Sequence, residues 1–199
     1  MTRKEQKEER RKAILMAALT LFVEKGYYDT KITDIAAAVP MSTGLMFHYF
    51  ESKEELLLEV VKMGAEGTKA LSSGPAAQAM AELPADQYLK GFLKQMFSFA
   101  KEQPWVFYMF VLMGQVRRNG MPEEARKAAM EVESIDFTAA LIAKGQKDGI
   151  FREGDPILLS RCFWASVQGI MEEMAIDKEM ETPDPEWIVA ILRKEASGN

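Results

Sequence analysis

The segment Thr43–Phe50 combines residue types that can bind DNA with a spacing that gathers them on one side of a helix. At about 100° per residue, that side carries an imidazole, a phenol, a bare backbone and a leucine: His48, Tyr49, Gly44 and Leu45. The opposite side carries three residues that can pack inward: Met46, Phe47 and Phe50. Imidazole and phenol groups donate to phosphate oxygens or base edges, and a leucine can contact a thymine methyl. We therefore predict a helix presented to the DNA major groove, with packing of this face against the protein itself as the alternative.

The preceding residues predict a second short helix and a tight turn. The inner side of that helix is apolar, with Ile32, Ile35 and Ala36. Pro40 ends it, because the residue before a proline is disfavoured in the α region. The fixed φ of proline also predicts that the turn avoids positive φ at this position. Ser42 is a suitable N-cap for the helix that follows, and the turn has the length of a helix-turn-helix.

A third helix is predicted to begin after Phe50. Ser52 and Glu55 have the spacing of a capping box, in which each side chain accepts from the backbone N–H of the other. Lys53 lies in the first turn, where a basic charge opposes the helix dipole. A phosphate close by would explain that placement.

The stretch from Ile14 to Val60, with AALTLFVEKGYYDTKITDIAAAV and then STGLMFHYFESKEELL, resembles the DNA-binding domain of the TetR family of transcriptional regulators. The resemblance implies an N-terminal domain of residues 1–55, with the helix-turn-helix at about 31–50. It implies DNA contacts from the second helix, the recognition helix and a phosphate-binding lysine: Thr33, Ser42, Thr43, Gly44, Leu45, Phe47, His48, Tyr49 and Lys53.

Four positions differ from the family pattern. Pro40 replaces the usual turn glycine, and Phe47 replaces a tyrosine and so loses a phosphate hydrogen bond. Leu45 replaces a threonine, which removes another polar contact. Lys31 stands where an N-cap is usual, so the second helix is expected to begin from Thr30. The fold expectation is unaffected, whereas the individual base contacts are left open.

The charge of the chain favours DNA binding only at its beginning. The net charge of the 199 residues is −5, which does not favour a polyanion as partner. Residues 1–12, by contrast, carry six Lys and Arg against three Glu. This start is predicted to be either an arm that follows the DNA backbone or minor groove, or the frayed beginning of a helix.

Other features argue against a secreted protein, a membrane protein and an enzyme. The single cysteine, Cys162, excludes an internal disulfide, fits the reducing cytoplasm, and is predicted to be buried in an apolar run. No signal peptide and no apolar run long enough for a membrane span is visible. The only histidine lies in the predicted reading helix, and no metal-ligand or nucleophile–base cluster appears. We expect a cytoplasmic protein that is not an enzyme and needs no cofactor or metal.

The remaining sequence predicts further helices and no strand, hence an all-α fold of about nine helices with a C-terminal domain of residues 56–199. Asp155-Pro156 and Asp184-Pro185 each pair an N-cap with a proline at the first helical position. The predicted helices run over Ser52 to about Leu71, Asp86–Lys101, Trp105 to about Arg118, Glu123 to about Lys147, Pro156 to about Ile176, and Pro185 to about Ala196. The apolar run at the start of the third of these predicts a helix buried on all sides.

In the family, the C-terminal domain binds a small effector and its last two helices pair with those of a second subunit. The candidate lining of an effector pocket is apolar and aromatic, with one amide: Met63, Phe92, Met96, Phe99, Trp105, Tyr108, Met109, Leu112, Phe137, Trp164 and Gln168. Solid core is the alternative for each of them. The candidate homodimer interface comprises Phe163, Val167, Ile170, Met174, Trp187, Ile188 and Ile191, part of which is also expected to be core.

The sequence therefore predicts a ligand-responsive transcriptional regulator. In this hypothesis a homodimeric repressor binds a palindromic operator in double-stranded DNA and is released by a small hydrophobic or aromatic effector. The alternative is a ligand-binding protein of the same fold with weak or lost DNA binding, favoured by the acidic balance and by Leu45 and Phe47.

Overall fold

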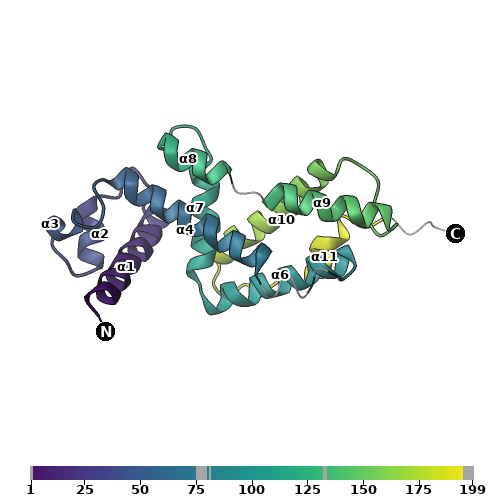
Figure 1. Cartoon of the computed structure of the whole chain (residues 1–199), viewed down its shortest axis with the longest axis horizontal. Coiled ribbons are helices and arrows are strands. Elements are labelled where there is room, and N and C mark those ends of the chain that lie inside the picture. The colour runs from purple at the N-terminus through teal and green to yellow at the C-terminus, as the bar shows by residue number, and fades with distance from the viewer. Residues whose placement is uncertain (1, 75–79, 81, 132–133, 195–199) are drawn as a thin grey trace. The chain divides into compact units, whose positions relative to one another are not determined.

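A computed structural model describes residues 2–74, 80, 82–131 and 134–194, with the backbone alone for 70–73. Throughout these ranges the secondary structure is helical, apart from one isolated antiparallel bridge between Phe151 and Arg193 (Figure 1). The predicted all-α fold is confirmed. No helix in the described ranges is long and apolar enough to span a membrane.

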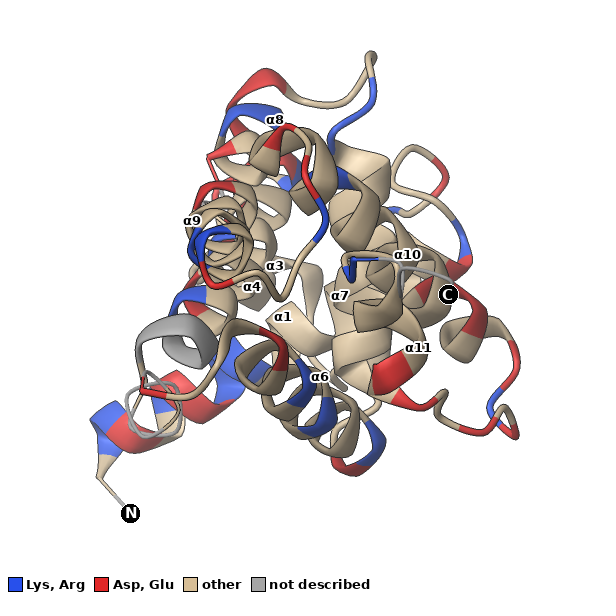
Figure 2. Cartoon of the chain, turned by 90° about the vertical axis from the view of Figure 1, so that its right-hand side faces the viewer, with Lys and Arg blue, Asp and Glu red and all other residues tan. Residues whose placement is uncertain are grey.

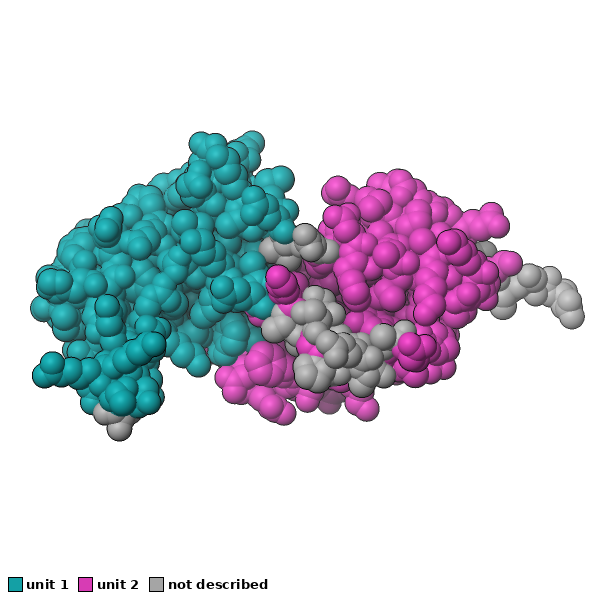
Figure 3. Space-filling view, in the orientation of Figure 1, with its two compact units in different colours: residues 1–66, 105–131 teal, residues 67–104, 132–199 magenta. Residues whose placement is uncertain are grey.

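The helices form two compact units (Figure 3). Unit 1 consists of residues 1–66 and 105–131, and unit 2 of residues 67–104 and 132–199. The predicted boundary at residue 55, between a DNA-binding domain and an effector-binding domain, stays a prediction. The compact units have other boundaries, because residues 105–131 pack with the N-terminal helices.

Unit 1 contains α1 (Arg3–Glu24), α2 (Ile32–Ala38), α3 (Thr43–Met46), most of α4 (Lys53–Ser73), α7 (Trp105–Val116) and α8 (Glu123–Met130). α1 packs against both α2 and α7. The first turn of α1 is closed by a capping box, in which the backbone N–H of Glu5 donates to the Thr2 hydroxyl and that of Thr2 to the Glu5 carboxylate. The basic start of the chain is therefore a capped helix rather than an extended arm or a frayed end.

α7 is enclosed on all sides, as its composition predicted. Each of its residues is buried or half-buried. Gly64 of α4 permits close approach to it, because a Cβ at this glycine would lie 2.5 Å from Sδ of Met109.

The single helix predicted from Glu123 to about Lys147 is wrong. The structure has two helices there, α8 and α9 (Ser134–Lys147), and Glu131 caps the first of them. Residues 132 and 133 lie outside the described ranges. The sequence has no Gly or Pro at this break; α8 packs with α7 in unit 1 and α9 packs with α10 in unit 2, so tertiary contacts override local propensity.

Unit 2 contains α6 (Ala85–Glu102), α9, α10 (Pro156–Ile176) and α11 (Pro185–Ala190). The two predicted Asp-Pro starts are confirmed. Asp155 accepts from the backbone N–H of Ile157 at 2.8 Å, and Asp184 accepts from that of Glu186 at 2.9 Å.

α11 ends at Ala190, earlier than predicted. The chain leaves the helix to pair with the segment after α9: the backbone N–H of Arg152 donates to the Leu192 carbonyl at 2.8 Å. Arg193 then forms ion pairs with Glu186 at 2.6 Å and Asp86 at 3.1 Å. Long-range pairing therefore replaces the expected last turns, of which residues 195 and 196 lie outside the described ranges.

Candidate nucleic-acid interface

α2 begins at Ile32, and its first turn is held by Asp34. The Asp34 carboxylate accepts from the Lys31 backbone N–H at 3.1 Å and lies 3.5 Å from Nζ of Lys25. That backbone hydrogen bond and the charge of Lys25 lower the pKa of Asp34. Thr30 is not the cap that the sequence predicted. It is buried, with its hydroxyl 2.7 Å from the carbonyl oxygen of Gly26.

The turn after α2 keeps a glycine-like backbone in spite of its proline. The Met41 N–H donates to the Ala36 carbonyl at 3.0 Å, the six-to-one bond of a Schellman C-cap. Pro40 occupies the position that is normally left-handed in this motif and has a φ of 20°. The expectation that the turn avoids positive φ at Pro40 is therefore wrong. The proline ring, which prefers a φ of about −65°, is strained there.

Ser42 caps the next helix as predicted, with its hydroxyl accepting from the Leu45 N–H at 3.2 Å. The helix itself, α3, is shorter than predicted and ends at Met46. Beyond it the His48 N–H donates to the Leu45 carbonyl at 3.1 Å and the Tyr49 N–H to the Met46 carbonyl at 2.9 Å. These two bonds have the three-residue spacing of a 3₁₀ turn, whereas the N–H groups of Phe47 and Phe50 donate to the Thr43 and Met46 carbonyls with α-helical spacing.

The side chains in and around α3 differ in how far they are buried. Met46 and Phe50 are buried as predicted, but Phe47 is 51% exposed, against the prediction that it packs inward. On the helical wheel Phe47 follows Met46 by about 100°, so it lies at the edge of the packed side, where residue type alone does not decide burial. The exposed members of the predicted DNA-binding set are Thr33, Ser42, Gly44, Phe47 and His48. The half-buried members are Thr43, Leu45, Tyr49 and Lys53.

The predicted capping box at the start of α4 is half confirmed. The Ser52 hydroxyl accepts from the Glu55 N–H at 3.0 Å. The Glu55 carboxylate, however, accepts from the N–H of Glu51 at 2.5 Å instead of that of Ser52.

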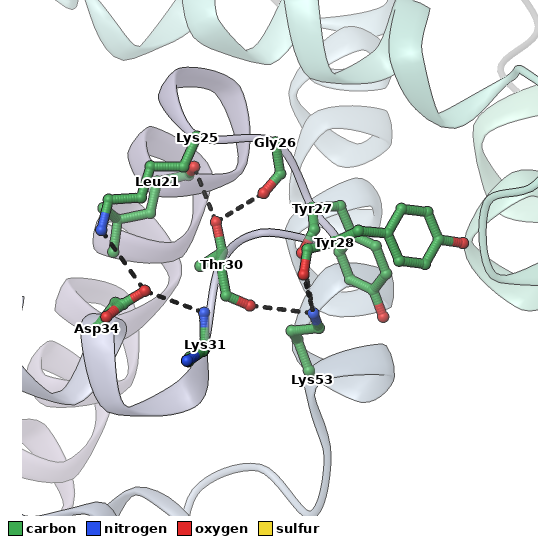
Figure 4. A network of polar contacts seen from close by, with 9 residues as sticks. All are labelled: Leu21, Lys25, Gly26, Tyr27, Tyr28, Thr30, Lys31, Asp34 and Lys53. Carbon is green, nitrogen blue, oxygen red and sulfur yellow. Dashed lines mark hydrogen bonds and ion pairs between the residues drawn. The ribbon is translucent and has the colours of Figure 1, made fainter.

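Lys53 points into unit 1, although the sequence predicted a phosphate contact. Its ammonium lies 2.9 Å from the carbonyl oxygen of Tyr27 and 3.0 Å from that of Thr30 (Figure 4). It also lies 4.4 Å from the centroid of the Tyr27 ring. Burial, and then the nearby Glu54 carboxylate, raise the pKa of the Tyr27 phenol far above its usual value.

The basic start of α1 is partly engaged within unit 1. Arg11 forms an ion pair with Glu59 of α4 and lies 5.2 Å from the centroid of the Phe50 ring. A hydrogen bond from Lys62, and then that from Arg11, lower the pKa of Glu59 against the effect of its burial. Acidic and basic residues alternate along the first turns of α1 (Figure 2). Fewer positive charges of this helix are therefore available to DNA phosphates than the number of its basic residues suggests.

The predicted effector residues are distributed over both units. Unit 1 holds Met63, Trp105, Tyr108, Met109 and Leu112. Unit 2 holds Phe92, Met96, Phe99, Phe137, Trp164 and Gln168. In unit 2 the rings of Phe92 and Trp164 are in edge contact, with centroids 6.1 Å apart. The Trp164 indole N–H lies 3.0 Å from the hydroxyl of the buried Thr138.

Three of the predicted effector residues, Tyr108, Phe99 and Phe137, are not simply buried. The Tyr108 hydroxyl donates to the Glu24 carboxylate at 3.0 Å, so it ties α7 to the end of α1. The phenol hydroxyl is directed toward α1, and the place of Tyr108 in a pocket lining stays a prediction. Phe99 and Phe137 are partly exposed. A second tie joins the same region of unit 1, where the Tyr28 hydroxyl donates to the Gly120 carbonyl beyond α7.

Four of the predicted dimer contacts fill the core of unit 2. Phe163, Val167, Met174 and Ile188 are buried within the chain itself, as was expected for part of this set. Ile170 is half-buried, whereas Trp187 is 70% exposed and Ile191 is partly exposed.

The structure shows strongly exposed apolar side chains at both ends of α10, of which sequence reasoning missed Ile176. Leu158 is 59% exposed and Ile176 is 77% exposed. Cys162, predicted to be buried, is exposed between them. Cys162 lies four residues after Leu158, and Ile176 lies eighteen residues after it. Both separations are close to whole helical turns, and this spacing is the signal that could have shown that the three residues share one side of α10.

Comparison with known proteins identifies the N-terminal region. Residues 14–60 match the family described as "Bacterial regulatory proteins, tetR family". The regulator HbdR of Aromatoleum sp. (strain CIB) is 47% identical over 55 residues, which are 28% of this chain and 24% of HbdR. The N-terminal region of the chain is therefore similar to this family. The likeness to RutR of Escherichia coli O157:H7 is longer but weaker, 26% identity over 160 residues that cover 80% of this chain and 72% of RutR.

Solved structures share the fold over more than nine-tenths of the chain. MbdR from Azoarcus sp. CIB superposes with a TM-score of 0.76 at 24% identity, over 94% of this chain and 98% of MbdR. AibR, solved with isovaleryl coenzyme A and operator DNA, superposes with a TM-score of 0.72 at 18% identity, over 92% of this chain and 98% of AibR. The chain spans only about a quarter of the length of HbdR and of the repressor KstR2 from Rhodococcus jostii. These relatives are regulators, which agrees with the prediction that the chain is not an enzyme.

Proposed function

We propose that this protein is a cytoplasmic, DNA-binding transcriptional regulator of the TetR family. The observation that carries the proposal is the outward side of the helix-turn-helix. Met46 and Phe50 anchor the motif in unit 1, while Ser42, Phe47 and His48 are exposed around α3. A motif held rigidly on one side with free hydrogen-bonding and aromatic groups on the other is suited to a major groove.

The proposed contacts are of two chemical kinds. Ser42, His48 and Thr33 offer hydroxyl and imidazole groups to phosphates and base edges. Phe47 offers an exposed ring to a thymine methyl, and Gly44 leaves room for the DNA backbone beside α3. Thr43, Leu45 and Tyr49 are half-buried and are proposed as contacts at the edge of the DNA-binding surface.

We further propose that the protein acts as a homodimer on a palindromic operator. The exposed apolar side chains of α10 and α11, namely Leu158, Ile176, Trp187 and Ile191, form the surface proposed for the second copy. A two-fold dimer would place two copies of α3 in successive major grooves, with half-sites about 34 Å apart.

A small hydrophobic or aromatic molecule is the proposed effector, and repression relieved by that molecule is the proposed mode of action. The aromatic contact of Phe92 with Trp164 in unit 2 supports an apolar ligand. AibR shows that the same fold accommodates an acyl coenzyme A together with operator DNA. For effector binding to weaken DNA binding, the coupling free energy between the two binding events would be about 1–3 kcal/mol.

Selection of genomic DNA fragments on the immobilised protein, followed by gel shifts, tests the proposal. We expect one enriched palindromic sequence whose binding is weakened by His48→Ala and by Phe47→Ala. The second candidate is a TetR-fold ligand-binding protein without DNA binding, which the net charge of −5 and the inward direction of Lys53 favour. A selection that enriches no sequence would replace the first proposal by this one.

A further inference from the structure

The loop between α1 and α2, residues 25–31, is joined to the start of α4 by one side chain. Nζ of Lys53 lies 2.9 Å from the carbonyl oxygen of Tyr27 and 3.0 Å from that of Thr30. The carbonyl oxygen of Tyr28 lies 3.5 Å from the same nitrogen. Figure 4 shows the ammonium pointing into the loop. An ammonium group has three N–H donors, so these three carbonyls can use them all.

The carbonyls that Lys53 approaches belong to the loop, three to six residues beyond Glu24, the last residue of α1. Backbone carbonyls that are shielded from water need a hydrogen-bond donor, and one ammonium group from α4 supplies it. Contact with the Tyr27 ring adds a cation–π attraction.

The position of this loop determines where α2 begins. Thr30 is fully buried and its hydroxyl is held by carbonyls of α1 and of the loop. The next residue, Lys31, donates its N–H to Asp34, which closes the first turn of α2. A displacement of Thr30 would therefore move α2, its exposed Thr33 and the turn that leads to α3.

We propose that Lys53 is a positioning residue: it fixes the α1–α2 loop, and through it the helix-turn-helix, instead of donating to a DNA phosphate. The inference rests on the proposed DNA binding for its effect on affinity. Its effect on the loop is independent of DNA, so the two can be tested separately.

The main experiment compares the wild type with Lys53→Met, which keeps the length of the side chain but removes its charge and donors. Hydrogen exchange without DNA is expected to become about tenfold faster at the loop amides of Thr30 and Lys31, which donate to Gly26 and Asp34, because a hydrogen bond to a charged group is lost. Binding to mixed-sequence duplex DNA, measured by fluorescence anisotropy, is expected to weaken with an unchanged dependence on salt. A lost phosphate contact would instead lower the salt slope by about 0.9.

Lys53→Arg keeps the charge and serves if the methionine variant does not fold. A planar guanidinium fits a phosphate at least as well as an ammonium does, but does not match three convergent carbonyls. Positioning therefore predicts faster loop exchange and weaker binding for this variant, whereas a phosphate contact predicts binding that is unchanged or tighter. Lys62→Met is the matched control, since Lys62 lies on the same helix and pairs with Glu59 away from the loop. Its loop exchange should equal that of the wild type.

Two results would overturn the inference. One is a lower salt slope in Lys53→Met with loop exchange as in the wild type, which would assign Lys53 to a phosphate. The other is loop exchange that accelerates equally in Lys62→Met, which would reflect a general loosening of unit 1. If the wild type does not bind mixed-sequence DNA even at low salt, the proposed function fails, while the exchange data still decide the role of Lys53.

Discussion

At the scale of single residues, Pro40 is where the backbone of unit 1 stores strain. It is the only non-glycine residue with a positive φ in the described ranges, and it fills the left-handed position of a Schellman cap. Proline has no N–H, so it also leaves out the second hydrogen bond of that motif.

Pro40→Gly should therefore stabilise the protein. Relief of strain of about 1–3 kcal/mol exceeds the gain in unfolded-chain entropy of about 1 kcal/mol, so the net effect is about 1 kcal/mol in favour of the fold. Thermal and urea unfolding measure it. Pro185→Gly is the control, because Pro185 occupies the first position of α11, where proline is favourable, and its loss should destabilise. A lower Tm for Pro40→Gly would show that this turn does not hold the proline under strain.

Helix caps could be predicted from the sequence, but the exposure of individual side chains could not. Ser42 and Asp155 cap as predicted because a cap depends only on residues two or three positions away. Phe47 was placed inward because it lies at the edge of the packed side of the helical wheel, yet it is exposed. Burial at such an edge depends on tertiary packing, which residue type alone does not decide.

At the scale of elements, the packing of α9 against α6 and the segment after it depends on Gly145. A Cβ built there would lie 2.3 Å from Cδ2 of the buried Phe151 ring and 3.1 Å from Cβ of Ala85. A ring enclosed in a core has little room to move.

Gly145→Ala is accordingly expected to destabilise the protein by about 1–3 kcal/mol, in spite of the better helix propensity of alanine. Urea unfolding gives the value. Gly67→Ala makes the same chemical change in α4 where nothing lies within 4 Å of the new Cβ, and should stabilise by about 0.5–1 kcal/mol. Equal effects of the two substitutions would contradict the clash with Phe151.

Charge also joins elements in unit 2, where Asp86 of α6 binds Lys90 at 3.3 Å and Arg193 after α11 at 3.1 Å. Burial acts to raise the pKa of Asp86, but hydrogen bonds from Lys90 and Arg193 lower it overall. A carboxylate with a lowered pKa contributes stability above its unfolded pKa of about 3.9 and loses it as the pH falls through the folded value.

The difference in Tm between the wild type and Asp86→Asn should therefore be constant above about pH 5 and shrink as the pH falls below about 4. Differential scanning fluorimetry over this range measures it. A difference that stays the same in acid would show that the amide substitution acts through packing rather than charge.

The ends of elements were predictable only where the chain itself marks them. The Asp-Pro pairs fixed the starts of α10 and α11 because cap and proline act locally. The break between α8 and α9 and the early end of α11 follow from packing in different units and from pairing of Arg193 with Phe151. Neither contact leaves a signal in neighbouring residues.

At the scale of the whole molecule, the surface proposed for a second subunit lies on α10 and α11. Sequence reasoning selected the apolar residues of α10 and α11 by type, and type alone does not separate the core-facing Phe163 from the outward-facing Leu158. Large exposed apolar side chains lie at the two ends of α10, Leu158 and Ile176, and the exposed residues on the same side between them are the small Cys162, Ala165 and Gly169.

A charge placed at either end of this side of α10 tests the dimer. Leu158→Glu and Ile176→Glu leave the core of unit 2 intact but would bury a carboxylate between subunits, so each should shift sedimentation from dimer to monomer. Binding to a palindrome should then require much higher protein concentration, because a single α3 contributes only half of the contacts. Met130→Glu introduces the same charge at an exposed methionine of α8 in unit 1 and should remain dimeric. Wild-type sedimentation as a monomer, or dimers that persist in both α10 variants, would exclude this face as the interface.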